Sequence, residues 1–167
     1  MNDQELHLLT IAEAAPLIES RSLSPVELTQ AYLERIERLD ADLGAYITVM
    51  ADSVLAQASR AESEIANGGY RGRMHGIPIA VKDIIYTRGV LTSAGSRVLA
   101  DHIPEYDSTL VERLDAAGSV LLGKLNLSEF AIGGTIDHPY GTPRNPWDTG
   151  KSAGGSSSGS AVAVAGG

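Results

Sequence analysis

Cysteine is absent from this 167-residue chain, and basic side chains are scarce in it. Without cysteine the chain has no disulfide framework, no thiolate metal ligand and no thiol nucleophile. Lysine and arginine number 13 against 21 acidic residues, which gives a formal net charge of −8 at pH 7. Because nucleic-acid binding relies on clustered basic side chains, this balance argues against direct contact with nucleic acid. No apolar run approaches the roughly 20 residues of a membrane span.

The residues that are present have the composition of a folded domain. Hydrophobic residues make up 43% of the chain and charged residues 20%. A chain of this length and composition predicts a domain with a hydrophobic core. Residues 1–6 are polar and acidic and do not resemble a signal peptide, so a cytoplasmic protein that does not contact a membrane is expected.

The first third of the chain has the signals of helix starts. Thr10 with Glu13 predicts a capping box for a helix through Ser20. Ser24 repeats the cap signal, and Pro25 stands at the first helical position, where its missing N–H costs nothing. The apolar stripe of this second helix, which is predicted to end near Asp40, consists of Leu28, Tyr32, Ile36 and Leu39.

Short apolar segments then alternate with helical patterns. Strands are predicted over 45–50, 77–81 and 120–122. One helix between them carries Val54, Ala58, Ala61 and Ile65 and ends at Gly68 and Gly69; another, capped by Asp107 or Ser108, ends at Gly118. Residues 132–155 are rich in loop-forming residues. The alternation predicts an α/β fold in which helices flank a mixed sheet.

Lys82 directly follows the apolar segment 77–81 and precedes Asp83. One interpretation is a surface lysine paired with a neighbouring acid. The other is a buried lysine that acts as a base, because burial disfavours the ammonium form and lowers the pKa of the amine. The residues alone leave both interpretations open.

A short Gly/Ser stretch, 154–160, leads into the small apolar run 161–165. It is either a flexible linker or a loop that gathers backbone N–H groups before a buried helix, as anion-binding and oxyanion sites do. Both interpretations stay open. A natural chain terminus directly after an apolar run of this kind is not expected.

Three other motifs are incomplete. Gly150-Lys151-Ser152 matches the end of a phosphate-binding P-loop, but Asn145 occupies the position of its first glycine. Ser157 is the central serine of a Gly-x-Ser-x-Gly pattern, yet all four histidines precede it, so the chain order Ser, Asp, His cannot be completed. The histidines are also scattered, which argues against a metal site.

Four blocks, taken in order, resemble the amidase signature family. The block 76–83 is similar to the family's lysine-bearing strand, and 118–126 with 129–131 to its next strand and turn. The block 140–148 is similar to the loop before the signature, and 154–161 to the start of the Gly/Ser-rich signature. The resemblance covers nearly the whole chain and implies the mixed α/β fold of that family.

The resemblance also implies an activity, the hydrolysis of an amide to a carboxylate and ammonia or an amine by a Ser–cis-Ser–Lys triad. Lys82 matches the family lysine, the final proton acceptor, and Ser156 matches the bridging serine, whose peptide bond is cis in the family. The candidate oxyanion or substrate loop consists of Gly154, Gly155, Ser157 and Ser158. No cofactor and no metal ion is implied.

Two features depart from the family pattern. The family nucleophile lies about two dozen residues beyond the bridging serine and therefore past Gly167, so the 167 residues alone are expected to be inactive. Ser158 occupies a position where the family usually has glycine, and a proton relay through Ser157 stays open.

We therefore expect one incomplete amidase domain over 1–167, with a mainly helical region at 1–70 and the start of the catalytic core at 71–167. The expected substrate is a small-molecule amide, and homo-oligomerisation is open. The block 127–135 favours a stand-alone amidase. The alternatives are the A subunit of the tRNA-dependent amidotransferase and a non-catalytic remnant or interaction module.

Overall fold

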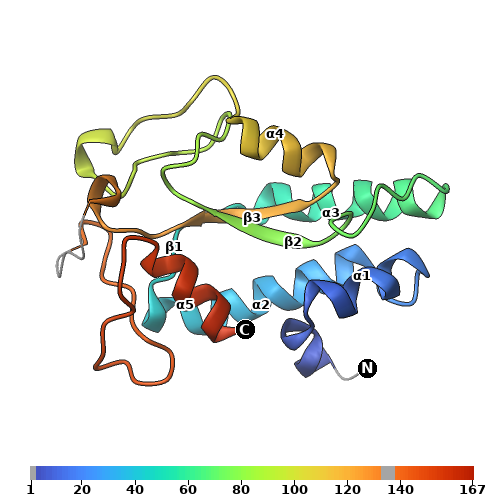
Figure 1. Cartoon of the computed structure of the whole chain (residues 1–167), viewed down its shortest axis with the longest axis horizontal. Coiled ribbons are helices and arrows are strands. Elements are labelled where there is room, and N and C mark those ends of the chain that lie inside the picture. The colour runs from blue at the N-terminus through green and yellow to red at the C-terminus, as the bar shows by residue number, and fades with distance from the viewer. Residues whose placement is uncertain (1–2, 133–137) are drawn as a thin grey trace. The chain divides into compact units, whose positions relative to one another are not determined.

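The computed structural model describes residues 3–132 and 138–167 (Figure 1). The chain divides into two compact units. The first unit holds the residues up to Glu37, Met50–Ile79 and Glu112–Leu122, and the second holds Arg38–Val49, Ala80–Val111 and Gly123–Gly167. Within the described ranges no helix is both long and apolar enough to cross a membrane. The expectation of one incomplete domain that divides near residue 70 stays a prediction.

The first unit is mainly helical, and two of its helices begin where the sequence predicts them. Its elements are η1 (Asp3–Leu8), α1 (Ile11–Glu19), most of α2 (Pro25–Leu43) and α3 (Ala51–Ala66). Thr10 N–H donates to Glu13 Oε2 at 2.8 Å, and Thr10 Oγ1 accepts from Glu13 N–H at 3.3 Å. This reciprocal capping box confirms the predicted start of α1.

Helix α2 confirms its predicted start but not its predicted end. Ser24 Oγ accepts from the Val26 N–H at 3.0 Å, and Pro25 is the first helical residue. The helix continues past Asp40 to Leu43. Asp40 does not end it, because its Oδ1 accepts instead from the N–H of Ala45 at 2.7 Å. The helix ends at Gly44, whose φ of 65° is the left-handed conformation that glycine adopts without strain.

The core of the first unit is built from the apolar faces of these helices. Its buried members are Leu6, Ala14, Ile18, Leu23, Leu28, Ile65 and Ile77. Beside it, the imidazole of His75 is fully buried and stacked on the ring of Tyr70, with 6.0 Å between ring centroids. Gly118 packs directly on that imidazole, since a Cβ at this position would collide with the ring.

The three strands form a mixed sheet in the order β1 (Tyr46–Val49), β3 (Val120–Leu125), β2 (Pro78–Lys82). β1 pairs with β3 in antiparallel fashion. β2 and β3 run in the same direction, because Val120 N–H donates to Ile77 O and Asp83 N–H donates to Leu125 O, each at 2.9 Å. The predicted class, an α/β fold with a mixed sheet, is confirmed.

β3 is longer than the predicted strand at 120–122, and Gly123 explains the difference. Gly123 pairs with Val49 of β1. A Cβ at Gly123 would collide with the Thr48 carbonyl oxygen, so the glycine permits β1 to approach closely at this point. The strand therefore continues through Gly123 to Leu125.

The second unit also contains η2 (Arg97–Leu99), most of the loop-rich segment, η3 (Glu129–Ala131) and α5 (Ser158–Gly166). Ser108 rather than Asp107 caps α4 (Thr109–Ala116), since the Ser108 hydroxyl accepts from Val111 N–H at 3.4 Å. Asp107 Oδ1 instead accepts from Arg88 N–H at 2.7 Å. The part of the predicted loop at 133–137 lies outside the described residues.

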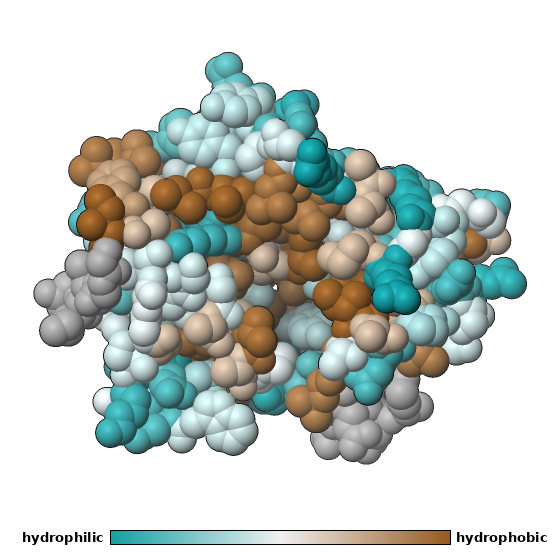
Figure 2. All heavy atoms as spheres, in the orientation of Figure 1, coloured by the Kyte–Doolittle hydropathy of each residue, from teal (hydrophilic) through white to brown (hydrophobic). Residues whose placement is uncertain are grey.

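A helix, α5, follows the Gly/Ser stretch, and it is buried on one face only, so the interpretation of a buried helix holds only in part. Val162 is fully buried, whereas Val164 is 85% exposed. A helix turns its successive residues to different sides, so a continuous apolar run does not by itself predict burial all round. Figure 2 shows apolar side chains, drawn in brown, at the surface of the face that it presents.

Candidate active site

Lys82 is the last residue of β2, and its amine meets two serine hydroxyls. Its Nζ donates to Ser156 Oγ at 2.7 Å and to Ser157 Oγ at 2.9 Å. The side chain is half-buried, and burial lowers the pKa of the Lys82 amine below its ordinary value. A lysine in this setting gives up its proton more readily than an exposed lysine, and the hydroxyls offer a path for that proton.

The two hydroxyls belong to a tight turn that precedes α5. The peptide bond between Gly155 and Ser156 is cis. Gly154 adopts a φ of 77°, and its N–H donates to Ser152 Oγ at 3.1 Å. The carbonyl oxygen of Ser156 accepts from the N–H of Ser128 at 3.1 Å. The backbone bonds thus hold the turn, and the Ser156 hydroxyl meets Lys82.

The segment after β3 anchors the start of α5. Gly159 N–H donates to the carbonyl oxygen of Asn126 at 2.9 Å. A Cβ at Gly159 would collide with the backbone of Asn126 and with the Ala45 carbonyl oxygen, so only glycine fits here. The Asn126 amide donates in turn to the carbonyl oxygens of Gly44 at 3.1 Å and Gly141 at 2.9 Å. The turn is therefore fixed by the end of the sheet.

The structure brings most of the predicted site residues together. Lys82, Ser156 and Ser157 are in hydrogen-bond contact, and Gly154 and Gly155 form the turn beside them. Ser158 differs, since its hydroxyl is buried and lies 3.3 Å from Nε2 of His138. The catalytic roles of these residues, and the use of the loop as an oxyanion hole, stay predictions.

A buried ion pair adjoins Lys82 in the chain and was not predicted. Lys124 Nζ lies 3.4 Å from Asp83 Oδ1, and both side chains are fully inaccessible. Asp83 is thus the partner of Lys124, which argues against the interpretation of Lys82 as a surface lysine paired with it. One signal in the sequence could have revealed the pair. Lys124 stands within an apolar strand, where a lysine needs a buried counter-charge.

Hydroxyl groups complete the surroundings of the buried pair. Ser93 donates to Asp83 Oδ2 twice, from its N–H at 2.9 Å and from its Oγ at 2.5 Å. Lys124 Nζ donates to Thr92 Oγ1 at 2.6 Å. Burial lowers the pKa of Lys124, whereas the nearby Asp83 carboxylate raises it. The charges of the pair are thus buried together and matched to one another.

The other motifs form no site of their own in the described residues. The P-loop-like residues Lys151 and Ser152 are exposed on a turn. The backbone of Ser152 forms an isolated antiparallel β-bridge with Arg144. No group of three or more His, Asp or Glu side chains lies together as metal ligands within residues 3–132 and 138–167.

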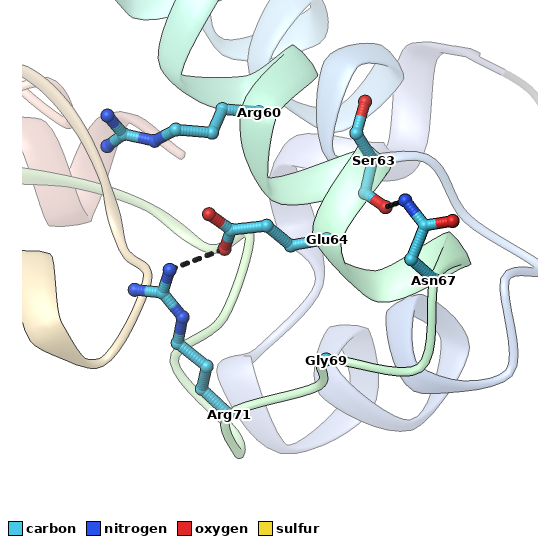
Figure 3. Close-up of a pocket in the computed structure, with 6 residues that line it drawn as sticks. All are labelled: Arg60, Ser63, Glu64, Asn67, Gly69 and Arg71. Atoms are coloured by element: carbon cyan, nitrogen blue, oxygen red, sulfur yellow. Dashed lines mark hydrogen bonds and ion pairs between the residues drawn. The ribbon is translucent and has the colours of Figure 1, made fainter.

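A shallow pocket lies in the first unit, and none of the predicted site residues lines it. Its volume is about 540 Å³, and it is lined by Arg60, Ser63, Glu64, Asn67, Gly69 and Arg71. Figure 3 shows the guanidinium of Arg71 turned toward the carboxylate of Glu64, which it contacts at 2.6 Å. Because its central charges already neutralise each other, the pocket offers no evident group for catalysis.

The comparisons with known proteins agree on one family. The family model described as Amidase matches residues 27–167. The A subunit of a glutamyl-tRNA(Gln) amidotransferase from Methylococcus capsulatus (strain ATCC 33009 / NCIMB 11132 / Bath) is 52% identical over 161 residues, which are 96% of this chain and 33% of that protein. The chain spans about a third of the length of the curated relatives that it matches.

Solved structures of similar fold match nearly the whole of this chain. The native peptide amidase from Stenotrophomonas maltophilia has a TM-score of 0.85 and 41% identity, over 92% of this chain and 33% of that chain. An inhibitor-bound complex, described as a vestigial protein complex that reveals the origins of an s-triazine catabolic enzyme, has a TM-score of 0.90 and 37% identity. That match covers 95% of this chain and 35% of the other.

Proposed function

This chain belongs to the Amidase family, and we propose on that premise that it carries the base and the bridging serine of an enzyme that cleaves amide bonds. The observation that carries the proposal is the contact of the Lys82 amine with Ser156 Oγ at 2.7 Å. It joins two residues 74 positions apart, one from the block that resembles the family's lysine-bearing strand and one from the block that resembles the start of the signature. A half-buried lysine with a lowered pKa supports the role of proton acceptor.

The proposed reaction proceeds through an acyl-enzyme. Neutral Lys82 accepts a proton from the Ser156 hydroxyl, which takes one from a nucleophilic serine as that serine attacks the amide carbonyl carbon. The relay returns the proton to the nitrogen, which leaves as ammonia or an amine when the C–N bond breaks. Water then attacks the ester carbonyl carbon, the C–O bond to the nucleophilic serine breaks, the relay passes a proton from the water to the serine oxygen, and the acid leaves as its carboxylate. The family pattern puts the nucleophile past Gly167, so we propose that the 167 residues alone do not complete this cycle.

Among amide-cleaving enzymes, we infer that the natural protein is the A subunit of an amidotransferase, which acts with partner proteins. The support is the 52% identity to a protein of that name, against 41% to the peptide amidase. The preference for a stand-alone amidase, drawn from the block 127–135, is the less well supported of the two. Part of that block lies at 133–135, outside the described residues.

Ammonia release by the natural full-length protein tests the proposed chemistry. A panel of L-glutamine, L-asparagine and a carboxy-terminally amidated peptide serves as substrates. We expect Lys82→Ala and Ser156→Ala to lower kcat/KM by about 10²–10⁴-fold, the usual contribution of general acid–base catalysis. Lys151→Ala, which changes an exposed lysine, is the control. Full activity in Lys82→Ala would refute the proposal.

Co-purification and substrate choice separate the two kinds of enzyme. A component of an amidotransferase is expected to purify from its source cells with the other components and to favour a free amino-acid amide. A stand-alone amidase, the second candidate, is favoured by the fold match to the peptide amidase; it would purify without partners and cleave the peptide amide. A protein with neither partners nor activity would instead be a remnant.

A further inference from the structure

The end of β2, which carries Lys82, is tied to its surroundings through the next residue. Asp83 N–H donates to Leu125 O at 2.9 Å, and Asp83 O accepts from Ala94 N–H at 3.0 Å. Ser93 donates two further bonds to the Asp83 carboxylate. The chain is therefore fixed at Asp83 by both its backbone and its side chain, one residue after the amine that meets Ser156.

The two neighbours carry charges of opposite sign into different surroundings. Consecutive residues at a strand end project to opposite sides, and accordingly Lys82 contacts Ser156 and Ser157 while Asp83 contacts Ser93 and Lys124. Consecutive Cα atoms are only about 3.8 Å apart, and the Asp83 side chain is fully buried, so a net charge on it would be weakly screened and would act on the half-buried Lys82 side chain. Lys124 supplies the cation that removes this net charge.

On the premise of the proposed function, we propose that Asp83 and Lys124 form a charge-balanced anchor for Lys82. The pair holds the strand end from which Lys82 reaches the bridging serine. Lys124 also cancels the carboxylate that would otherwise keep the Lys82 amine protonated. Both residues act through Lys82 and are positioning residues, since neither contacts a serine of the turn.

Two other titratable groups of the described residues, Glu129 and His138, have hydrogen-bond partners in the second unit. Glu129, on η3, accepts from Ser96 Oγ at 2.6 Å. His138 lies 3.3 Å from Ser158 Oγ. The groups that meet Lys82 directly are the neutral hydroxyls of Ser156 and Ser157. Burial is the cause that lowers the pKa of Lys82.

The test is the pH dependence of kcat/KM in the natural full-length protein, with the best substrate of the amide panel. Lys124→Met leaves the Asp83 carboxylate unpaired. The amine of Lys82 should then hold its proton more tightly, and the midpoint of the rising limb should move to higher pH by about one unit. The double variant Lys124→Met/Asp83→Asn removes both charges and should return the midpoint to that of the parent.

A midpoint that returns to the parent value in the double variant would show that the shift in Lys124→Met is an effect of charge. A purely structural defect would persist or grow when the second residue is changed. Lys151→Met and Glu105→Gln, both at exposed positions, are the matched charge controls and should leave the midpoint in place. If Lys124→Met does not fold, Asp83→Asn is the variant to use. It leaves the Lys124 cation unpaired, so the midpoint should move in the opposite direction, to lower pH. Thermal melting of every variant shows which ones are folded.

Two results would overturn the proposal: an unchanged midpoint in folded Lys124→Met, or a double variant whose midpoint stays displaced. The activity of Lys82→Ala shows whether the proposed function fails or only the charge-balanced anchor. An active Lys82→Ala variant refutes the function itself. An inactive Lys82→Ala variant together with unmoved midpoints in the pair variants refutes the charge-balanced anchor alone.

Discussion

His75 and Glu64 form a part-buried contact in the first unit, with 3.1 Å between His75 Nε2 and Glu64 Oε2. The other ring nitrogen, Nδ1, accepts from the N–H of Arg71 at 3.1 Å, so the neutral ring carries its proton on Nε2. Burial and the Arg71 cation lower the pKa of His75, and Glu64 only partly opposes them. The folded unit therefore favours the neutral imidazole.

Stability should consequently fall in mild acid. The pKa of His75 is lower in the folded state than in the unfolded state, whose value is about 6.5, so the unfolded chain binds the proton more readily. The contribution of the neutral His75 ring to the free energy of unfolding is complete above pH 6.5. It is lost as the pH falls below 6.5, by at most about 1.4 kcal/mol per pH unit. Melting temperatures between pH 5 and pH 8 measure the effect. A His75→Gln variant with an equally steep loss would contradict the assignment.

Gly159→Ala should damage both stability and activity. The added Cβ meets the backbone of Asn126 and the Ala45 carbonyl oxygen, none of which can move without shifting the sheet. Overpacking of this kind costs about 1–3 kcal/mol, and it would displace the turn that holds Ser156. Gly166→Ala in the same helix is the control, since its Cβ would make an ordinary 3.6 Å contact with Leu43. Equal melting temperatures for the two variants would argue against the close packing.

Activity should rise with pH until the Lys82 amine is neutral. Because burial lowers the pKa of Lys82, the midpoint of the rise in kcat/KM should lie below the ordinary lysine pKa of about 10.4. Lys82→Arg keeps a cation but loses the base, since a guanidinium does not deprotonate in proteins. We expect it to lower kcat/KM by about 10²–10⁴-fold. A pH profile that is flat from pH 6 to 10 would remove Lys82 from the proposed relay.

Single serine variants should show which hydroxyl relays the proton. Both Ser156 and Ser157 accept a hydrogen bond from Lys82. Ser156 has the shorter contact, 2.7 Å against 2.9 Å, and matches the bridging serine of the family, so Ser156→Ala should cost about 10²–10⁴-fold in kcat/KM and Ser157→Ala about tenfold or less. The reverse order in steady-state kinetics would assign the relay to Ser157.

Local signals predicted most helix starts, because a cap depends on neighbouring residues. Thr10 with Glu13, and Ser24 before Pro25, needed no knowledge of the rest of the chain. The ends were harder to predict. The sequence suggested that the helix ends near Asp40. The Asp40 carboxylate instead accepts a hydrogen bond from the Ala45 N–H, and this bond depends on where Ala45 lies in the fold. The extent of β3 likewise depended on the approach of β1 to Gly123.

The candidate site was predictable only as far as its residues stand in recognisable blocks. Lys82 and Ser156 were named from such blocks, and the contact between them depends on a turn whose position follows from long-range packing. The partnership of Lys124 with Asp83 was missed because burial of a lysine is a property of the folded chain. The local sequence contains one sign of this pair, which is that Lys124 is a charged residue in an apolar strand. Interpreting that sign requires knowing which acidic residue lies beside Lys124 in the fold.

The end of β3 bonds to both halves of the proposed relay. Leu125 O accepts from Asp83 N–H beside Lys82, while Asn126 and Ser128 bond to Gly159 and Ser156. A displacement of this end of the central strand would therefore carry the lysine and the serine turn along together and leave the gap between them almost unchanged. Proton transfer needs the two groups within hydrogen-bond reach, and this shared attachment would preserve that distance while the sheet moves.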